Sequence, residues 1–134
     1  MSATTIQRRV TIDDLLADAR STLVRLDPRD SLAATAAGGV IVDIRSDAQR
    51  ADQGSLPGAR VVARNVLEWR FDAETDYCDA ELIAVTGPLI LMCAEGYQSS
   101  LAAANLQRIG VARATDMIGG FEAWRAQELP VLPW

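Results

Sequence analysis

The fold depends most on one stretch, Leu89-Ile90-Leu91-Met92-Cys93-Ala94-Glu95-Gly96-Tyr97-Gln98-Ser99-Ser100, in which an apolar run ends at a cysteine and a small turn precedes an alanine-rich pattern. This pattern predicts a buried strand over 89–92 and then a helix that Ser99 or Ser100 caps. A thiol at the end of such a strand faces free backbone N–H groups and the positive end of a helix dipole, which favour a thiolate. We therefore predict that Cys93 is a nucleophile. The alternative is that Cys93 is a buried cysteine acting as a small apolar residue.

Strand and helix patterns alternate along the rest of the chain, with short turns between them. The expected strands cover 23–26, 40–44, 59–63, 89–92 and 114–118, and the expected helices cover 12–22, 28–38, 46–53, 80–85, 101–109 and 121–127. This order implies an α/β fold with a mostly parallel sheet. Functional groups gather at the carboxyl ends of the strands in such sheets, where Asp43, Arg45 and Cys93 fall.

The first 23 residues are expected to form an N-terminal extension, followed by one domain over 24–134. Thr11 and Asp14 resemble a capping box, and apolar residues recur at helical spacing over 12–22. This amphipathic helix either covers the sheet or mediates dimerisation, and we favour covering.

Composition limits the classes of function. The chain has 134 residues, of which 49% are hydrophobic, which suits a single domain. Its net charge of −5 argues against nucleic acid as a partner. Its apolar runs are too short for a signal peptide or a membrane span. We expect a soluble cytoplasmic protein that binds no membrane and is a monomer or a homodimer.

The chain contains no histidine, and all thirteen of its cationic side chains are arginine. A Cys-His pair, a histidine-bearing metal site and a lysine Schiff base are therefore excluded. Activation of Cys93 must come from backbone dipoles or arginines, and we expect neither a metal nor a cofactor. The second cysteine, Cys78, lies in an acidic segment. It either resolves an oxidised or persulfidated Cys93 or is incidental, and we favour the latter.

Four motifs, in order along 27–133, resemble those of the rhodanese domain, a sulfurtransferase module. They are Val42-Asp43-Ile44-Arg45, Gly54-Ser55-Leu56-Pro57-Gly58-Ala59, Cys93-Ala94-Glu95-Gly96-Tyr97-Gln98-Ser99 and Gly119-Gly120-Phe121-Glu122-Ala123-Trp124. The resemblance implies a three-layer fold, with a central, mostly parallel five-stranded sheet between helices. It also implies that the cysteine takes sulfur from a sulfane-sulfur donor, holds it as a persulfide and passes it to cyanide or a thiol.

The same resemblance implies the site residues and the partners. Cys93 would be catalytic, and the residues expected to bind substrate are Ala94, Glu95, Gly96, Tyr97, Gln98, Ser99, Asp43 and Arg45. For Asp43 and Arg45 we favour an ion pair that ties the strand ends, and the alternative is that they touch the substrate. The expected partner is a small sulfur compound, a thiol acceptor or a protein that accepts sulfur.

The catalytic loop departs from the family pattern in its charges. Ala94 and Gln98 stand where the family usually carries arginine or lysine, Glu95 adds a negative charge, and Ser55 replaces the usual histidine. We therefore expect dianionic thiosulfate to be a poor donor. Arg64 and Arg70 either supply the missing charge or are ordinary surface residues. A non-catalytic module that binds a partner or senses redox state is the alternative function.

A phosphatase is the main rival within this fold. The loop from Cys93 to Gln98 has six residues, whereas the similar cell-cycle phosphatases use a loop one residue longer that ends in arginine. Phosphoryl transfer needs arginines or metals on the phosphate oxygens. The loop composition therefore favours sulfur transfer over phosphate hydrolysis.

Overall fold

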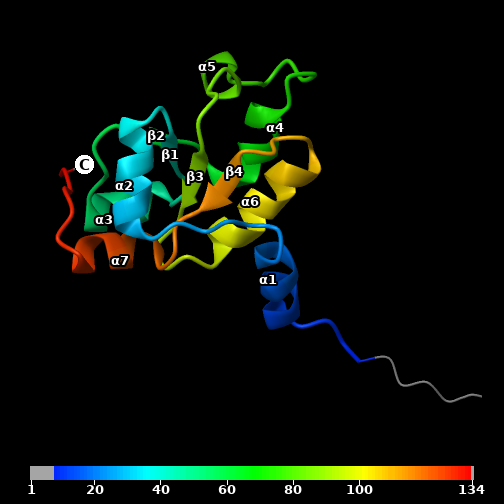
Figure 1. Ribbon diagram of the computed structural model, residues 1–134, viewed down its shortest axis with the longest axis horizontal. Helices are drawn as coiled ribbons and strands as arrows, with labels where there is room; N and C mark the ends of the chain where they lie inside the picture. The colour runs from blue at the N-terminus through cyan, green and yellow to red at the C-terminus, as the bar shows by residue number, and fades with distance from the viewer. Residues whose placement is uncertain (1–7, 134) are drawn as a thin grey trace, which may run out of the picture.

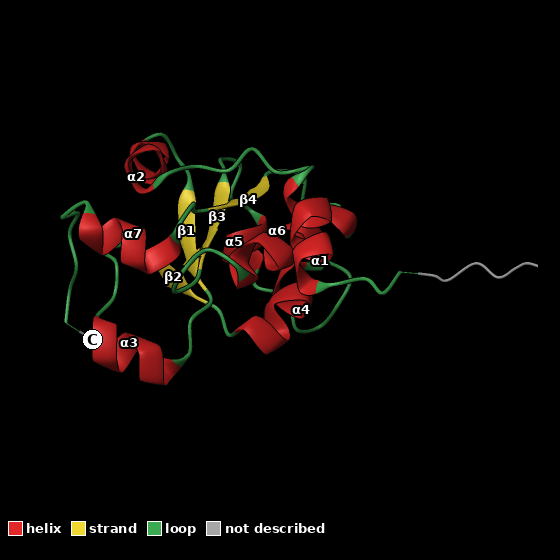
Figure 2. Ribbon diagram, turned by 90° about the horizontal axis from the view of Figure 1, so that it is seen from below, coloured by secondary structure: helices red, strands yellow, loops and turns green. Residues whose placement is uncertain are grey.

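A computed structural model describes residues 8–133. Residues 1–7 of the expected N-terminal extension and Trp134 of the expected domain lie outside the described residues. Its parallel sheet has four strands in the order β2-β1-β3-β4. Figure 2 shows helices on both faces of this sheet, so the prediction of a three-layer α/β fold is confirmed. The strands are β1 (Val40–Asp43), β2 (Arg60–Val61), β3 (Leu89–Met92) and β4 (Ala114–Asp116).

The helices lie in two layers. They are α1 (Ile12–Arg20), α2 (Pro28–Ala36), α3 (Asp47–Gln53), α4 (Leu67–Phe71), α5 (Ala80–Ile83), α6 (Gln98–Arg108) and α7 (Gly120–Ala126), with a 3-10 turn, η1 (Arg64–Val66). In Figure 2, α2 and α7 lie on one side of the strands, and α1, α4 and α6 lie on the other. Within the described residues, none of these helices is long and apolar enough to cross a membrane.

Strand β3 is central because its side chains are apolar on both faces. Successive side chains of a strand point to opposite faces, and all four residues of β3 are buried. Leu89 and Leu91 join the core cluster that α4, α5 and α6 cover, whereas Ile90 and Met92 join the cluster that contains residues of α7. Cys93 follows in the same alternation and lies on the α6 side.

The prediction of a fifth strand over 23–26 is wrong. In this segment Leu26 pairs with Met117 in an isolated parallel bridge, and no strand of the described sheet includes it. The ladder stops because Asp27 caps α2 with its side chain and Pro28, which has no backbone N–H, begins that helix. The chain therefore leaves the edge of the sheet as soon as it has reached it.

Helix α1 begins as the sequence predicts. The Asp14 N–H donates to the Thr11 hydroxyl at 3.1 Å, and the Thr11 N–H donates to the Asp14 carboxylate at 2.9 Å. The helix packs against α6, which itself covers the sheet, so α1 forms an outer addition to the helix layer (Figure 1). The helix thus packs on the domain through α6, and whether it also mediates dimerisation stays a prediction. Arg20 ends α1 and lies beside the loop that follows β3.

Candidate active site

Cys93 lies at the carboxyl end of β3 with 8% of its surface exposed. Its Sγ accepts hydrogen bonds from the N–H of Gly96 at 3.2 Å and from the N–H of Ser99 at 3.4 Å. The sulfur also borders a pocket of about 220 Å³. Backbone N–H groups aimed at a sulfur favour its anionic form. The predicted placement of this thiol is therefore confirmed.

A close backbone approach at Gly96 and two hydrogen bonds from the start of α7 shape the loop after Cys93. Gly96 has φ +87°, and a side chain there would place its Cβ 2.7 Å from the Gly119 nitrogen. At the start of α7, the Phe121 N–H donates to the Cys93 carbonyl at 2.8 Å, and the Glu122 N–H donates to the Ala94 carbonyl at 3.0 Å. The loop is thus held between the end of β3 and the first turn of α7.

The start of α6 differs from the prediction. The helix begins at Gln98, its N-cap is Tyr97, and the cap residue makes no side-chain hydrogen bond to the helix. The expectation that Ser99 or Ser100 caps the helix is wrong, because both hydroxyls donate to the Asp116 carboxylate at 2.8 Å. The Ser99 N–H is bonded instead to the sulfur of Cys93.

The pocket brings most of the predicted site residues together. Its lining comes from the ends of β1 and β3, from α3 and from the loop, and comprises Ile44, Arg45, Gln49, Cys93, Ala94, Glu95, Tyr97 and Gln98. Gly96 and Ser99 reach the sulfur through their backbone. Asp43 is fully buried and does not belong to this lining. Gln49 was not expected here, because its capping box with Ser46 predicts only a helix start.

Asp43 and Arg45 form the ion pair that the sequence favoured. Arg45 donates to both oxygens of the Asp43 carboxylate, at 3.1 and 2.8 Å, and both side chains are fully buried. The same guanidinium donates to Gln53 and to the carbonyl of Gly54, and it lies 4.3 Å from the centre of the Phe121 ring. Its charge is therefore compensated, and contact with substrate stays a prediction.

Arg64 is the other cation in front of the loop. Its Nε donates to the Gln98 side chain at 3.1 Å, while its Nη1 pairs with Glu68 at 2.9 Å. Burial raises the pKa of the Glu68 carboxyl, but hydrogen bonds from its own backbone N–H and from Asn105, with the charge of Arg64, outweigh burial and hold this pKa below its ordinary value. Glu68 is thus ionised at neutral pH and neutralises Arg64. Arg70 donates instead to the Tyr77 carbonyl.

A second set of charges lies behind the loop, and sequence reasoning missed it. The Gly96 carbonyl accepts from Arg20 Nη2 at 2.8 Å and from Arg25 Nη2 at 3.0 Å. Arg25 also pairs with the fully buried Asp116, at 2.8 Å from its Nε. Arg20 and Arg25 precede Gly96 by 76 and 71 residues, so no local spacing indicates these contacts. We call Arg20 and Arg25 the rear arginines.

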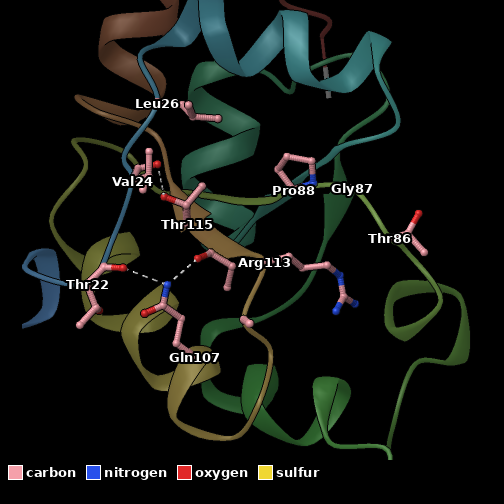
Figure 3. A pocket seen from close by; sticks show the side chains of 11 residues that line it. Thr22, Val24, Leu26, Thr86, Gly87, Pro88, Gln107, Arg113 and Thr115 are labelled. Carbon is pink, nitrogen blue, oxygen red and sulfur yellow. Dashed lines mark hydrogen bonds between the residues drawn. The ribbon is translucent and has the colours of Figure 1, made fainter.

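A larger hollow lies at the other end of the sheet (Figure 3). It measures about 450 Å³ and contains Pro88, which precedes β3, whereas Cys93 follows that strand. The Gln107 amide donates to the carbonyls of Thr22 and Ala114, and the Thr115 hydroxyl donates to that of Val24. These polar groups are thus bonded to the protein itself, and we assign the active site to the pocket at Cys93. Cys78 is a free, half-buried thiol on the loop before α5, and its resolving role stays a prediction.

Comparisons with known proteins identify related sulfurtransferases. The thiosulfate sulfurtransferase GlpE of Stutzerimonas stutzeri is 34% identical over 102 residues, which are 75% of this chain and 84% of that protein. A thiosulfate sulfurtransferase structure from Pseudomonas aeruginosa has a TM-score of 0.61 and 25% identity, and the alignment covers 79% of this chain and 18% of that one. These relatives support a sulfurtransferase activity.

A third relative is similar over nearly its whole length. A Rhodopseudomonas palustris structure, described as a "Protein of Unknown Function" and "Possible Tyrosine Phosphatase", has a TM-score of 0.84 and 30% identity. The alignment covers 98% of this chain and 99% of that chain. The model of the rhodanese-like domain matches residues 28–127. The chain therefore belongs to the rhodanese-like domain family.

Proposed function

We propose that this sulfurtransferase moves sulfane sulfur through a persulfide on Cys93, from a sulfur donor to a thiophilic acceptor. The observation that carries the proposal is the position of the sulfur. Sγ lies at the border of a pocket and accepts two backbone N–H groups, from Gly96 and Ser99. Those donors suit both a thiolate and the anionic terminal sulfur of a persulfide.

The transfer takes place in two displacements. The Cys93 thiolate attacks the sulfane sulfur of the donor, a new S–S bond forms, and the donor's own sulfur bond breaks with its electron pair on the leaving group. With thiosulfate the leaving group is sulfite. Cyanide or a thiolate then attacks the terminal sulfur, so that thiocyanate or a new persulfide leaves and the Cys93 thiolate is regenerated.

Charges around the pocket favour donors that carry little negative charge. Glu95 lines the pocket and is exposed, while the two cations nearest the front of the loop are paired, Arg45 with Asp43 and Arg64 with Glu68. A dianion gains little attraction there and is repelled by Glu95. We infer that a monoanionic donor such as a thiosulfonate loads Cys93 faster than dianionic thiosulfate does, although relatives are named for thiosulfate.

Intact mass spectrometry tests the proposal. The full chain is incubated separately with thiosulfate, a thiosulfonate, glutathione persulfide and inorganic polysulfide, and weighed before and after cyanide is added. We expect a gain of one sulfur atom that peptide mapping assigns to Cys93 and that cyanide removes. If no donor gives this adduct on Cys93, the persulfide mechanism is wrong.

A non-catalytic module that binds a partner or senses redox state is the second candidate. The observation in its favour is the same set of charges. Glu95 lies in the loop, and the two nearby arginines, Arg45 and Arg64, are paired with carboxylates. In that case Cys93 would alkylate at the rate of an ordinary free thiol and would take sulfur from none of the four donors. The mass experiment and one alkylation rate therefore separate the two functions.

Phosphate hydrolysis has less support, despite the description of the Rhodopseudomonas palustris relative. No arginine occurs between Cys93 and Ser100, and Arg45, which borders the pocket, is committed to Asp43. Transferred phosphoryl groups need such cations on their oxygens. We expect no turnover of p-nitrophenyl phosphate above that of a Cys93→Ser control.

Gln98→Arg is expected to raise kcat/KM for thiosulfate by about tenfold, because it adds a cation at the border of the pocket. Arg64 contacts Gln98, but its charge is already balanced by Glu68. The measurement is the rate of thiocyanate formation as a function of thiosulfate concentration at low ionic strength. Added salt should reduce the gain.

Gln98→Met is the matched control for that substitution. It removes the hydrogen bond from Arg64 without adding charge, so thiosulfate turnover should stay near the wild-type rate. Glu95→Gln removes a negative charge from the same pocket and should act in the direction of Gln98→Arg. An unchanged or lower rate in Gln98→Arg would contradict the electrostatic account of donor choice.

A further inference from the structure

The Gly96 carbonyl is held from behind by two guanidinium groups that do not belong to the matched family region. The match begins at residue 28, whereas Arg20 ends α1 and Arg25 lies on the segment after it. Both donate an Nη2 hydrogen to this carbonyl, at 2.8 and 3.0 Å. The N-terminal extension therefore contacts the catalytic loop at the residue whose N–H contacts the sulfur.

The geometry of one residue connects these arginines to the sulfur. The N–H of Gly96 points to Cys93 Sγ while its carbonyl points to the rear arginines. The next peptide bond is trans, so the Tyr97 N–H points opposite to the Gly96 carbonyl and away from the arginines. Arg20 also lies 5.7 Å from the centre of the Tyr97 ring. Fixing this carbonyl therefore fixes the orientation of the Gly96–Tyr97 peptide, which lies in the chain between the two N–H donors to the sulfur, Gly96 and Ser99.

The rear arginines also place positive charge near the sulfur. Arg25 is paired with Asp116, whereas Arg20 makes no salt bridge with any carboxylate in residues 8–133. Its Nε donates to the Ser100 hydroxyl, a neutral group. In the described residues Arg20 is thus linked to the Asp116 carboxylate only through that hydroxyl, and it contacts Gly96, whose N–H donates to the sulfur. Arg45 and Arg64, at the front, are both neutralised by carboxylates.

We propose that Arg20, assisted by Arg25, is a positioning residue that acts through the Gly96 carbonyl to keep the Cys93 sulfur anionic. The two guanidinium groups hold the peptide that lies between the two N–H donors to the sulfur, and so keep the loop in the shape that aims both donors at it. They also supply from behind the loop the positive charge that its own side chains lack. The inference rests on the proposed persulfide function, and it makes the N-terminal extension part of the active site.

The test is the rate of Cys93 alkylation as a function of pH in the full chain. All variants carry Cys78→Ser as the background, so that Cys93 is the only thiol that reacts. Alkylation by iodoacetamide needs the thiolate and no sulfur donor. In Arg20→Ala the midpoint of the profile should move upward by about 0.5 to 1 pH unit, so that the rate below the midpoint falls about three- to tenfold. Arg20→Lys keeps a charged donor and should restore most of the rate.

Arg29→Ala is the matched control, because Arg29 is exposed on α2 and its loss changes the net charge by the same single unit. Its profile should coincide with that of the background. Arg20→Gln keeps a donor for the Gly96 carbonyl without the charge, and should fall between the lysine and alanine variants. It also keeps the test available if Arg20→Ala does not fold.

The proposal is overturned if a folded Arg20→Ala or Arg20→Gln gives the background profile, or if lysine restores no more than alanine. Failure of the persulfide function gives a different result. In that case the mass experiment shows no sulfur adduct, while the alkylation profile still shifts in Arg20→Ala and returns in Arg20→Lys. The two outcomes are therefore distinguishable.

Discussion

Cys93→Ser is expected to abolish sulfur transfer, with a loss of at least about a thousandfold in turnover. A serine hydroxyl is a poor nucleophile without a general base, and the chain has no histidine to act as one. The substitution keeps the size of the side chain and both N–H donors, Gly96 and Ser99. The fold should therefore be retained. The measurement is thiocyanate formation from cyanide with whichever donor loads the wild type fastest.

Cys78→Ser is the control for this prediction. Cys78 is half-buried on the loop before α5 and lies outside the lining of the active-site pocket. Its turnover should match the wild type within a factor of about two, since we treat this thiol as incidental. Activity that survives in Cys93→Ser, or that disappears in Cys78→Ser, would contradict the assignment of the sulfur carrier.

Gly120→Ala should have the largest effect among the glycine substitutions, lowering the free energy of unfolding by about 3 kcal/mol. A Cβ at Gly120 would lie 2.3 Å from the Cys93 carbonyl oxygen and 2.9 Å from the Glu95 nitrogen. These are backbone atoms of the catalytic loop and cannot move without displacing it. Gly120 also has φ +57°, which adds strain for alanine. Denaturant unfolding measures the loss, and the alkylation rate of Cys93 should fall with it.

Gly58→Ala is the matched control, because Gly58 also has a positive φ, +75°, but has open space where the Cβ would be. It should show the backbone strain alone, about 1 kcal/mol, with an unchanged alkylation rate. If the two variants lose the same free energy of unfolding, the predicted clash between the Gly120 Cβ and the catalytic loop is contradicted.

The fold was largely predictable because local signals and the global pattern agree. The apolar residues of β3, the capping box at Thr11 and the Asp27-Pro28 helix start all occur as expected. The extent of the strand over 23–26 was not predictable, because it depends on how soon α2 turns the chain away from Met117. The family assignment followed from four local motifs and is confirmed.

The site was predictable where its residues lie near Cys93 in the sequence. Five of the six loop residues from 93 to 98 line the pocket, and Gly96 contacts the sulfur through its N–H. The rear arginines could not be found, because the packing of α1 on α6 brings them to the loop. The hydrogen bonds from the Ser99 and Ser100 hydroxyls to buried Asp116 could not be found either, because they also depend on tertiary packing. A cytoplasmic location and the oligomeric state stay predictions.

Among the described residues, no side chain caps the start of α6. The stability of its first turn therefore depends on the charge of the Cys93 sulfur. The Ser99 N–H, in the first turn, is bonded to the sulfur itself. An anionic sulfur therefore stabilises this turn, and an ordered turn stabilises the anion to the same extent. Any reagent that neutralises the sulfur weakens the turn that carries Gln98 at the pocket border.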